Sequence, residues 1–97
     1  MMKYEIHFAG SRVEKEFEKF LSKLSKKEEK RIYDSIAELG DNPRPPGKKF
    51  KFLEKELVFY KYVAHYRLRI GDCRVFYDVD DGKKVIILLG IERKGNL

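Results

Sequence analysis

The sequence predicts an α+β fold in which a two-helix antiparallel hairpin packs on one face of a four-stranded, mostly antiparallel sheet. In the first forty residues, two stretches repeat apolar side chains every three or four positions, as one face of a helix does. From residue 56 onward, apolar residues instead alternate or run together between turn signals, which is typical of strands. The expected order is strand, helix, helix, strand, strand, strand, in a single domain over residues 1–97.

The first strand and both helices are expected before residue 41. Alternating apolar and polar residues over 4–8 predict the strand. Ser11 with Glu14, and Ser25 with Glu28, have the spacing of capping boxes, so a helix should begin near each serine. The apolar residues that would face the core are Val13, Phe17, Phe20, Leu21 and Leu24 on the first helix, and Ile32, Ile36 and Leu39 on the second.

The second half should be a loop followed by three strands. Three prolines make residues 41–50 a loop, because proline lacks the backbone N–H that helices and ladders need. The next strand lies within residues 56–70, and residues 73–79 pair with it across a two-residue turn. Residues 80–83 contain Asp-Gly, a strong hairpin signal, and the continuously apolar stretch 85–91 predicts a central strand covered on both faces.

The hairpin around residues 66–77 presents arginines on one face. Alternation places one set of side chains inward: Ala64, Tyr66, Leu68, Ile70, Cys73, Val75, Tyr77 and Val79. It places the other set outward: His65, Arg67, Arg69, Arg74, Phe76 and Asp78. Arginine carries a planar, permanently charged fork of donors suited to phosphate, so the outer face is a candidate anion-binding surface. The alternative is the solvated face of a half-exposed sheet.

The charge distribution supports a polyanionic partner. The net charge is +6, and residues 41–97 hold thirteen Lys or Arg against eight Asp or Glu. Nucleic acid is the first candidate partner and an acidic protein segment the second, although a Lys/Glu-rich, heat-adapted proteome would also give a basic chain. The single cysteine excludes an intrachain disulfide and a cysteine-based zinc site. No apolar stretch predicts a membrane span or signal peptide, so we expect a cytoplasmic protein.

The same arginine hairpin resembles the RelE/ParE family of type II toxin–antitoxin toxins. The matching run is YRLRIGDCRVFYDVDDGKKVIILLGIERK, preceded by the proline-rich NPRPPGKKFKFL. The family pattern is Tyr-Arg-x-Arg-x-Gly-Asp-Tyr-Arg-x-x-Tyr, then an acidic turn, an apolar strand and a terminal arginine. The ordered set of motifs covers nearly the whole chain and implies the fold described above.

The resemblance, closest to RelE-like mRNA interferases, implies a metal-independent, cofactor-free endoribonuclease. Such a toxin cleaves mRNA in the ribosomal A site by attack of the 2′-OH on phosphorus, which inhibits translation and arrests growth. By similarity, Arg74 and Arg93 would stabilise the phosphate, and Arg67 and Arg69 occupy positions that are often lysines in relatives. Arginine is a departure there, because a guanidinium holds its proton too firmly to act easily as a general base.

Four further residues are expected to contact RNA: Lys48, Lys49, Lys51 and His65. The lysines would line a loop beside the groove, although plain solvated charge explains them equally well. His65 is the one obvious titratable proton carrier on the arginine side, with a structural role as the alternative.

Two other functions remain open, because the chain ends Lys-Gly-Asn-Leu where many active relatives carry a tyrosine. One is a ParE-like, non-enzymatic poison of DNA gyrase, and the other is a catalytically decayed toxin that only binds its antitoxin. In all three cases the resemblance implies a cognate antitoxin protein. We expect a monomeric free toxin that assembles with the antitoxin into a hetero-oligomer, with ribosome-bound mRNA as the second partner and no membrane.

Overall fold

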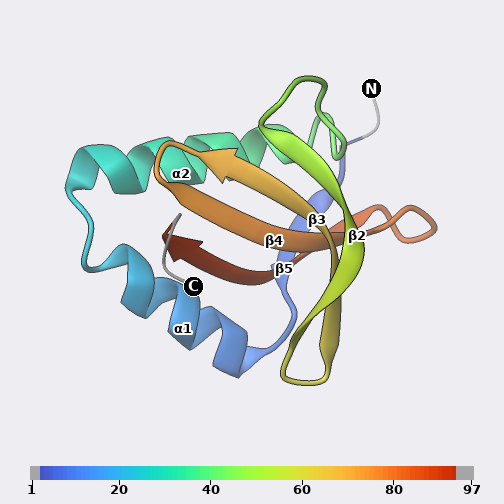
Figure 1. Ribbon diagram of the computed structural model, residues 1–97, viewed down its shortest axis with the longest axis horizontal. Coiled ribbons are helices and arrows are strands. Elements are labelled where there is room, and N and C mark those ends of the chain that lie inside the picture. The colour runs from blue at the N-terminus through green and yellow to red at the C-terminus, as the bar shows by residue number, and fades with distance from the viewer. Residues whose placement is uncertain (1–2, 94–97) are drawn as a thin grey trace.

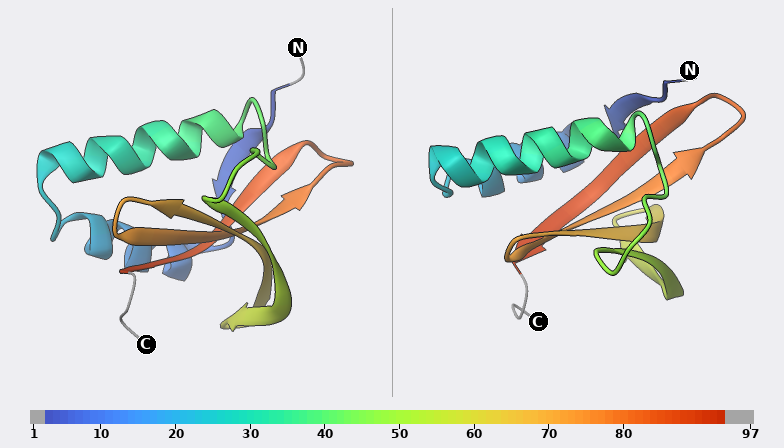
Figure 2. Two further views of the ribbon diagram at one scale, coloured as in Figure 1. Left: turned by 45° about the horizontal axis from the view of Figure 1, so that its top comes forward. Right: turned by 90° about the horizontal axis from the view of Figure 1, so that it is seen from above.

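The computed structural model describes residues 3–93 as a twisted five-stranded sheet with two helices on one face (Figures 1 and 2). The elements are β1 (Glu5–Phe8), α1 (Ser11–Leu21), α2 (Lys26–Leu39), β2 (Phe50–Phe59), β3 (Tyr62–Ile70), β4 (Cys73–Asp80) and β5 (Val85–Arg93). The strand order is β1-β5-β4-β3-β2, in which β1 runs parallel to β5 and the other neighbours are antiparallel. The predicted fold class is confirmed. The prediction of a central strand over residues 85–91 is also confirmed, since β5 lies between β1 and β4.

The sheet has one strand more than the sequence predicted. The segment expected to be a single strand within 56–70 is a hairpin of β2 and β3, and β2 already begins at Phe50. Its pairing with β3 shifts between Phe52 and Leu57, and as an edge strand it is exposed along most of its length. Both features remove the strict alternation that reveals a half-buried strand. The turn also lacks a sequence signal, since Tyr60, and not a glycine, takes the positive φ of 60°.

The capping prediction is confirmed for α2 and wrong for α1. The Ser25 hydroxyl accepts a hydrogen bond from the Glu28 backbone N–H at 3.1 Å, and the Glu28 carboxylate accepts from the Ser25 backbone N–H at 3.3 Å. In α1, Ser11 is already the first helical residue, and the N-cap is Gly10 without a side-chain cap. A Cβ at Gly10 would lie 3.0 Å from the Tyr62 hydroxyl, so a residue without a side chain fits this close approach.

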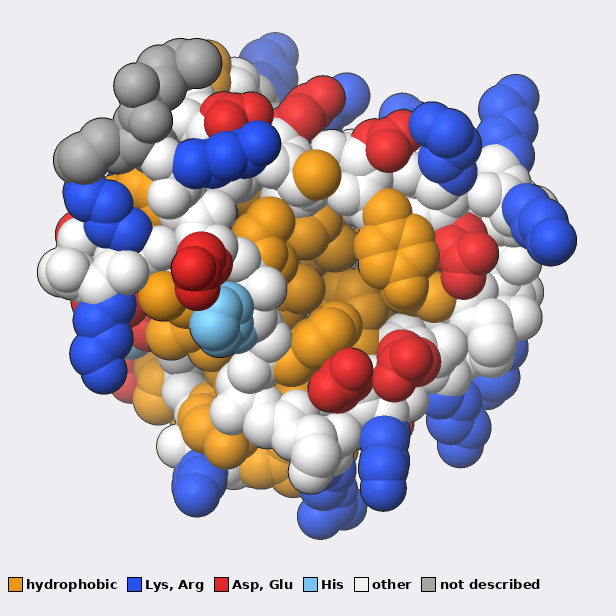
Figure 3. Space-filling model, turned by 180° about the vertical axis from the view of Figure 1, so that it is seen from behind, with side chains coloured by type: hydrophobic (Ala, Val, Ile, Leu, Met, Phe, Trp, Pro, Cys, Tyr) orange, Lys and Arg blue, Asp and Glu red, His pale blue; other side chains and the backbone are white. Residues whose placement is uncertain are grey.

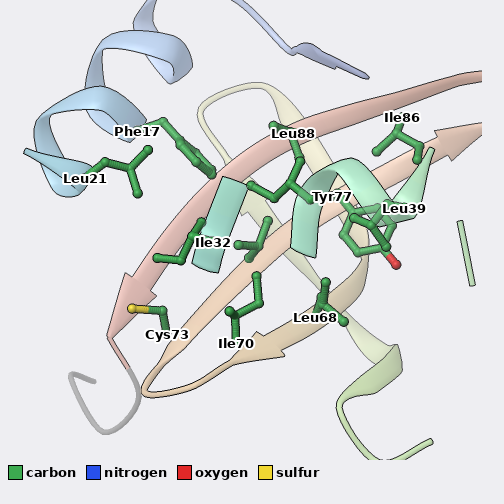
Figure 4. Close-up of a cluster of buried hydrophobic side chains, with 12 residues drawn as sticks. Phe17, Leu21, Ile32, Leu39, Leu68, Ile70, Cys73, Tyr77, Ile86 and Leu88 are labelled. Atoms are coloured by element: carbon green, nitrogen blue, oxygen red, sulfur yellow. The ribbon is translucent and has the colours of Figure 1, made fainter. Parts of the chain in front are cut away.

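The main core lies between the helices and the sheet (Figure 4). Its buried members are Phe17, Leu21, Ile32, Ile36, Leu39, Leu68, Ile70, Cys73, Val75, Tyr77, Ile86 and Leu88. Each large apolar side chain buried here stabilises the fold by roughly 1.5–3 kcal/mol. The Tyr77 hydroxyl, at the centre of this core, donates to the Pro43 carbonyl at 2.7 Å and thereby ties the proline-rich loop to the sheet.

A second, smaller cluster covers part of the opposite sheet face. Its buried members are Ala64, Phe76 and Leu89. Ala64 is buried as predicted, but in this cluster and not in the main core, because β3 pairs with β4 only from Tyr66 onward and its first residues follow the curled β2–β3 hairpin. Phe76 lies on the face opposite the helices as predicted, but it is buried in this cluster and not exposed. The Phe59 ring, also from that hairpin, packs on Phe76 with ring centroids 5.4 Å apart.

The curled hairpin tip is held at two further points. The Phe59 ring lies so close to Gly90 that a Cβ at position 90 would overlap it. The Arg12 guanidinium at the start of α1 stacks over the Tyr60 ring, 4.4 Å from its centroid. The hairpin tip therefore curls toward α1, and it does so across the sheet face that the helices do not cover (Figure 2).

The two helices leave part of the apolar surface between them uncovered (Figure 3). From behind, hydrophobic side chains are visible between them, bordered by acidic and basic side chains (Figure 3). Tyr33 of α2 is half exposed, and burial together with the charges of Glu29 and Glu18 raises the pKa of its hydroxyl.

Within residues 3–93, no helix is long and apolar enough to cross a membrane.

Candidate functional site

Three arginines gather on the sheet face opposite the helices. Arg69 of β3 lies directly opposite Arg74 of β4 in the antiparallel register, and Arg67 lies two residues back along β3. Like charges directly opposite each other destabilise a ladder, so this arrangement costs the fold stability. We call the surface of Arg67, Arg69 and Arg74 the arginine face.

Within residues 3–93, no carboxylate lies within ion-pair distance of the three arginines of the arginine face. Arg67, Arg69 and Arg74 form no ion pair with any residue in the range 3–93. The Nε atoms of Arg67 and Arg74 are buried and have no hydrogen-bond partner in that range. Burial, followed by the positive charges of Arg74 and Arg69, lowers the pKa of Arg67. An entering anion would satisfy the two buried donors and relieve the repulsion among three cations.

Two lysines extend the arginine face to the edge strand β2. Lys51 is the cross-strand partner of Arg67, so it lies in the strand and not in the loop that the sequence predicted. The Lys49 carbonyl accepts a hydrogen bond from the Arg69 backbone N–H at 2.8 Å, which places Lys49 next to Arg69 at the sheet edge. Lys48 is exposed in the turn before β2, and no described contact joins it to the arginines.

Arg93 does not join the other three arginines. It lies opposite Cys73, whose side chain belongs to the core on the helix side, while Glu92 lies opposite Arg74 on the arginine side. A β-bulge causes this difference. Leu89 is an extra residue between Leu88 and Gly90, so the side chains that follow lie on the opposite faces from those that strict alternation predicts. The role predicted for Arg93 stays a prediction, and Glu92 is a residue of this face that the sequence analysis did not assign to the site.

His65 lies on the open sheet face beside an acidic partner. Its Nδ1 is 3.2 Å from Oδ1 of Asp78, and both side chains are partly exposed. The same Oδ1 accepts a hydrogen bond from the Val79 backbone N–H at 2.9 Å. The register that pairs Tyr66 with Tyr77, continued by one residue, brings His65 opposite Asp78. The sequence placed both residues on one face, but their pairing was missed, although the two-residue turn already fixes it.

The arginine face adjoins an apolar groove of about 500 Å³ between α1 and the tip of the β2–β3 hairpin. Gly90 in its floor lies opposite Phe76, which in turn lies opposite Arg67. Further lining residues are Val13, Glu16, Phe17, Lys19, Phe20, Lys23, Val58, Phe59, Tyr60, Leu89 and Ile91. The open side of the sheet thus combines a cationic row with an apolar hollow.

Arg44 has a structural role in this basic half. Its guanidinium donates two hydrogen bonds to Asp81, at 3.2 and 2.8 Å, and a third to the Tyr66 hydroxyl at 3.1 Å. Hydrogen bonds from Arg44, and then from Tyr4, lower the pKa of Asp81 to about 2. This network fastens the proline-rich loop to the β4–β5 turn. Among residues 3–93, no three His, Cys, Asp or Glu side chains come together as metal ligands.

The comparisons with known proteins agree with this architecture. Residues 11–95 match the family model of the "ParE toxin of type II toxin-antitoxin system, parDE". The chain therefore belongs to the RelE/ParE family, and it is a toxin of a type II toxin–antitoxin system. Among curated proteins, no match to the chain is found.

Solved structures of RelE toxins share the fold. The archaeal RelE–RelB complex from Pyrococcus horikoshii OT3 contains a chain that is 26% identical, with a TM-score of 0.71, over 99% of this chain and 100% of that one. The toxin–antitoxin complex RelBE2 from Mycobacterium tuberculosis matches at 20% identity and a TM-score of 0.71, over 99% and 97% of the two chains. A mutant of the E. coli toxin RelE in the free state matches at 20% identity and a TM-score of 0.61, over 98% and 86%.

Proposed function

We propose that this toxin is an endoribonuclease that cleaves mRNA on the ribosome without a metal. The observation that carries the proposal is the arginine face, in which three arginines lie together and none of them forms an ion pair within residues 3–93. A structure that tolerates such repulsion has a place for an anion, and the arginine side chain matches the geometry of phosphate.

The chemistry of RNA cleavage suits this cluster. When the 2′-oxygen attacks the neighbouring phosphorus, the phosphorane gains negative charge that the substrate does not carry. Donors aligned with that developing charge accelerate the step, because they stabilise the transition state more than the ground state. Arg67 and Arg74, whose Nε atoms have no hydrogen-bond partner among the described residues, would hold the reacting phosphate. The RNA backbone on either side of that phosphate would be contacted by Arg69, Lys49 and Lys51.

A ParE-like protein that binds DNA gyrase and does no chemistry is the second candidate. The family model that matches the chain describes ParE toxins, and the bulge that directs Arg93 away from the arginine face leaves one cation fewer around a phosphate. The apolar groove beside the face also suits contact with a protein. The two candidates differ in whether translation itself is the target.

An antitoxin is the proposed protein partner of either toxin. Two of the solved relatives are RelE toxins in complex with their antitoxins. A cationic face next to an apolar groove fits a segment that carries acidic residues on one side and apolar residues on the other.

A cell-free translation assay separates the two functions. Translation of a preformed mRNA needs no gyrase, so an mRNA endonuclease should stop protein synthesis, whereas a gyrase poison should leave it unchanged. The Arg74→Met variant should fail to inhibit. The Lys15→Met variant, which removes one positive charge from an exposed position on α1, should inhibit like the wild type. Undiminished translation in the presence of folded wild-type protein would contradict the ribonuclease proposal.

A further inference from the structure

The arginine face supplies cations but no group to accept a proton. Cleavage through the 2′-oxygen requires that the 2′-OH lose its proton, and a guanidinium cannot take it at neutral pH. Lysine occupies none of the three positions that form the arginine face. The proton acceptor must therefore come from another side chain on the open face of the sheet, where Glu92 and His65 are the candidates, and only His65 has a partner that orients it.

His65 and Asp78 have the geometry of an oriented base. The carboxylate lies 3.2 Å from Nδ1, so it favours the tautomer in which Nδ1 carries the hydrogen and Nε2 carries the lone pair. Asp78 is itself held in place by the Val79 N–H, 2.9 Å from the same carboxylate oxygen. A histidine oriented by an anchored carboxylate is a recurrent arrangement in proton-transfer sites.

The pair also lies where a base is needed. His65 precedes Arg67 by two residues on β3, which is roughly 7 Å along a strand. Its contact with Asp78 places it on the arginine side, because Asp78 shares its face of β4 with Phe76. Arg67 lies opposite Phe76 on β4, and Asp78 follows Phe76 by two residues. The imidazole is thus the next side chain along β3 from Arg67, on the side away from Arg69, where it can reach the ribose of a nucleotide whose phosphate Arg67 holds.

We propose that His65 is the general base of this toxin and that Asp78 is its positioning residue, an inference that rests on the proposed ribonuclease function. Nε2 of His65 takes the 2′-OH proton, and the released electron pair forms the bond between the 2′-oxygen and phosphorus. The bond from phosphorus to the 5′-oxygen breaks, and that oxygen takes a proton from water. The products are a 2′,3′-cyclic phosphate and a 5′-hydroxyl, and the imidazolium returns its proton to solvent.

Single-turnover cleavage on purified ribosomes that carry a defined mRNA tests the proposal. The His65→Ala variant should cleave roughly 10²–10⁴-fold more slowly than the wild type, with unchanged affinity for the ribosome. Added imidazole should restore part of that rate, which it would not do if His65 only stabilised the fold. Asp78→Asn should also slow cleavage, but added imidazole should not restore its cleavage rate.

The matched control is His7→Ala. His7 is the other histidine of the chain, and it lies on edge strand β1, where its Nε2 is 2.9 Å from Oε1 of Glu5. It should retain the wild-type rate. Wild-type cleavage that persists unchanged in His65→Ala would overturn the proposal and leave the ribonuclease function standing. A loss of cleavage in Glu92→Gln, with an unchanged cleavage rate in His65→Ala, would also overturn the proposal that His65 is the base. No cleavage by the wild type would overturn both.

A readout that does not depend on activity uses the wild-type protein alone. Nitrogen NMR of the His65 ring distinguishes the two neutral tautomers. The proposal predicts a hydrogen on Nδ1 and a lone pair on Nε2, and a ring protonated at Nε2 alone would overturn it.

Discussion

Replacing Arg74 with methionine should make the protein more stable while it removes function. Methionine keeps the aliphatic stem of the side chain but removes the charge and the buried Nε donor, which has no partner within residues 3–93. Relief of the repulsion from Arg69 and Arg67 outweighs the lost attraction to Glu92, which lies opposite Arg74 on β5 without an ion pair, and the net contributes about 0.2–1 kcal/mol, by the usual magnitude of cross-strand pairs. Removal of an unsatisfied buried donor contributes about 1–3 kcal/mol. We expect a net gain of about 1–2 kcal/mol in the free energy of unfolding, since some solvent reaches the guanidinium.

Urea unfolding at low salt measures this gain, with Lys15→Met as the control. Both variants lose one positive charge, but Lys15 is exposed on α1 and has no ion pair among the described residues. The midpoint of Arg74→Met should rise without a change in slope, whereas that of Lys15→Met should stay near the wild-type value. A gain of 1 kcal/mol corresponds to roughly 4–8 °C in the melting temperature of a domain of this size.

Salt dependence identifies the electrostatic part of the gain. The screening length falls from about 10 Å at 0.1 M to about 3 Å at 1 M ionic strength, so the advantage of Arg74→Met should shrink as salt is added. A variant that is less stable than the wild type, or no more stable than Lys15→Met, would refute the argument that the arginine face carries uncompensated repulsion.

Three further predictions concern the scaffold. Tyr77→Phe removes the hydrogen bond to the proline-rich loop and should lower the free energy of unfolding by about 1 kcal/mol in urea titrations; an unchanged midpoint would contradict this. Arg44 holds the pKa of Asp81 at about 2, below its ordinary 3.8, so its stabilising effect is present above pH 4 and is lost as the pH falls toward 2. Asp81→Asn should therefore flatten the acid limb of a stability–pH curve, and an unaltered limb would argue against this contact. Gly90→Ala should collide with Phe59 and cost about 1–3 kcal/mol, but less in a Phe59→Ala background; strictly additive losses would count against the collision.

The arginine face was predictable from the sequence because local rules determine it. Strict alternation on both sides of a two-residue turn fixes which side chains share a face and which lie opposite each other. Arg67, Arg69 and Arg74 therefore appear together in the structure as the sequence predicts. The same rules placed Asp78 and His65 on one face, and only their direct pairing was overlooked.

The remaining differences come from tertiary contacts that leave little trace in the sequence. The bulge at Leu89 reverses the facing of Arg93, and its one sequence signal is the adjacent Gly90, because a glycine inside a strand often marks a bulge. Strand β2 lacks a regular pattern because it lies at the sheet edge and shifts its register. The curl that places Ala64 in the second cluster depends on Phe59 packing over Gly90, two residues that are far apart in the chain.

The most direct test of the ribonuclease proposal is primer-extension mapping of an mRNA on translating ribosomes, with and without the purified toxin. We predict new breaks at positions set by the reading frame for the wild type and for Lys15→Met, and none for Arg74→Met. An intact mRNA in the presence of wild-type toxin, or breaks that persist with Arg74→Met, would contradict the assignment of the arginine face as the site of RNA cleavage.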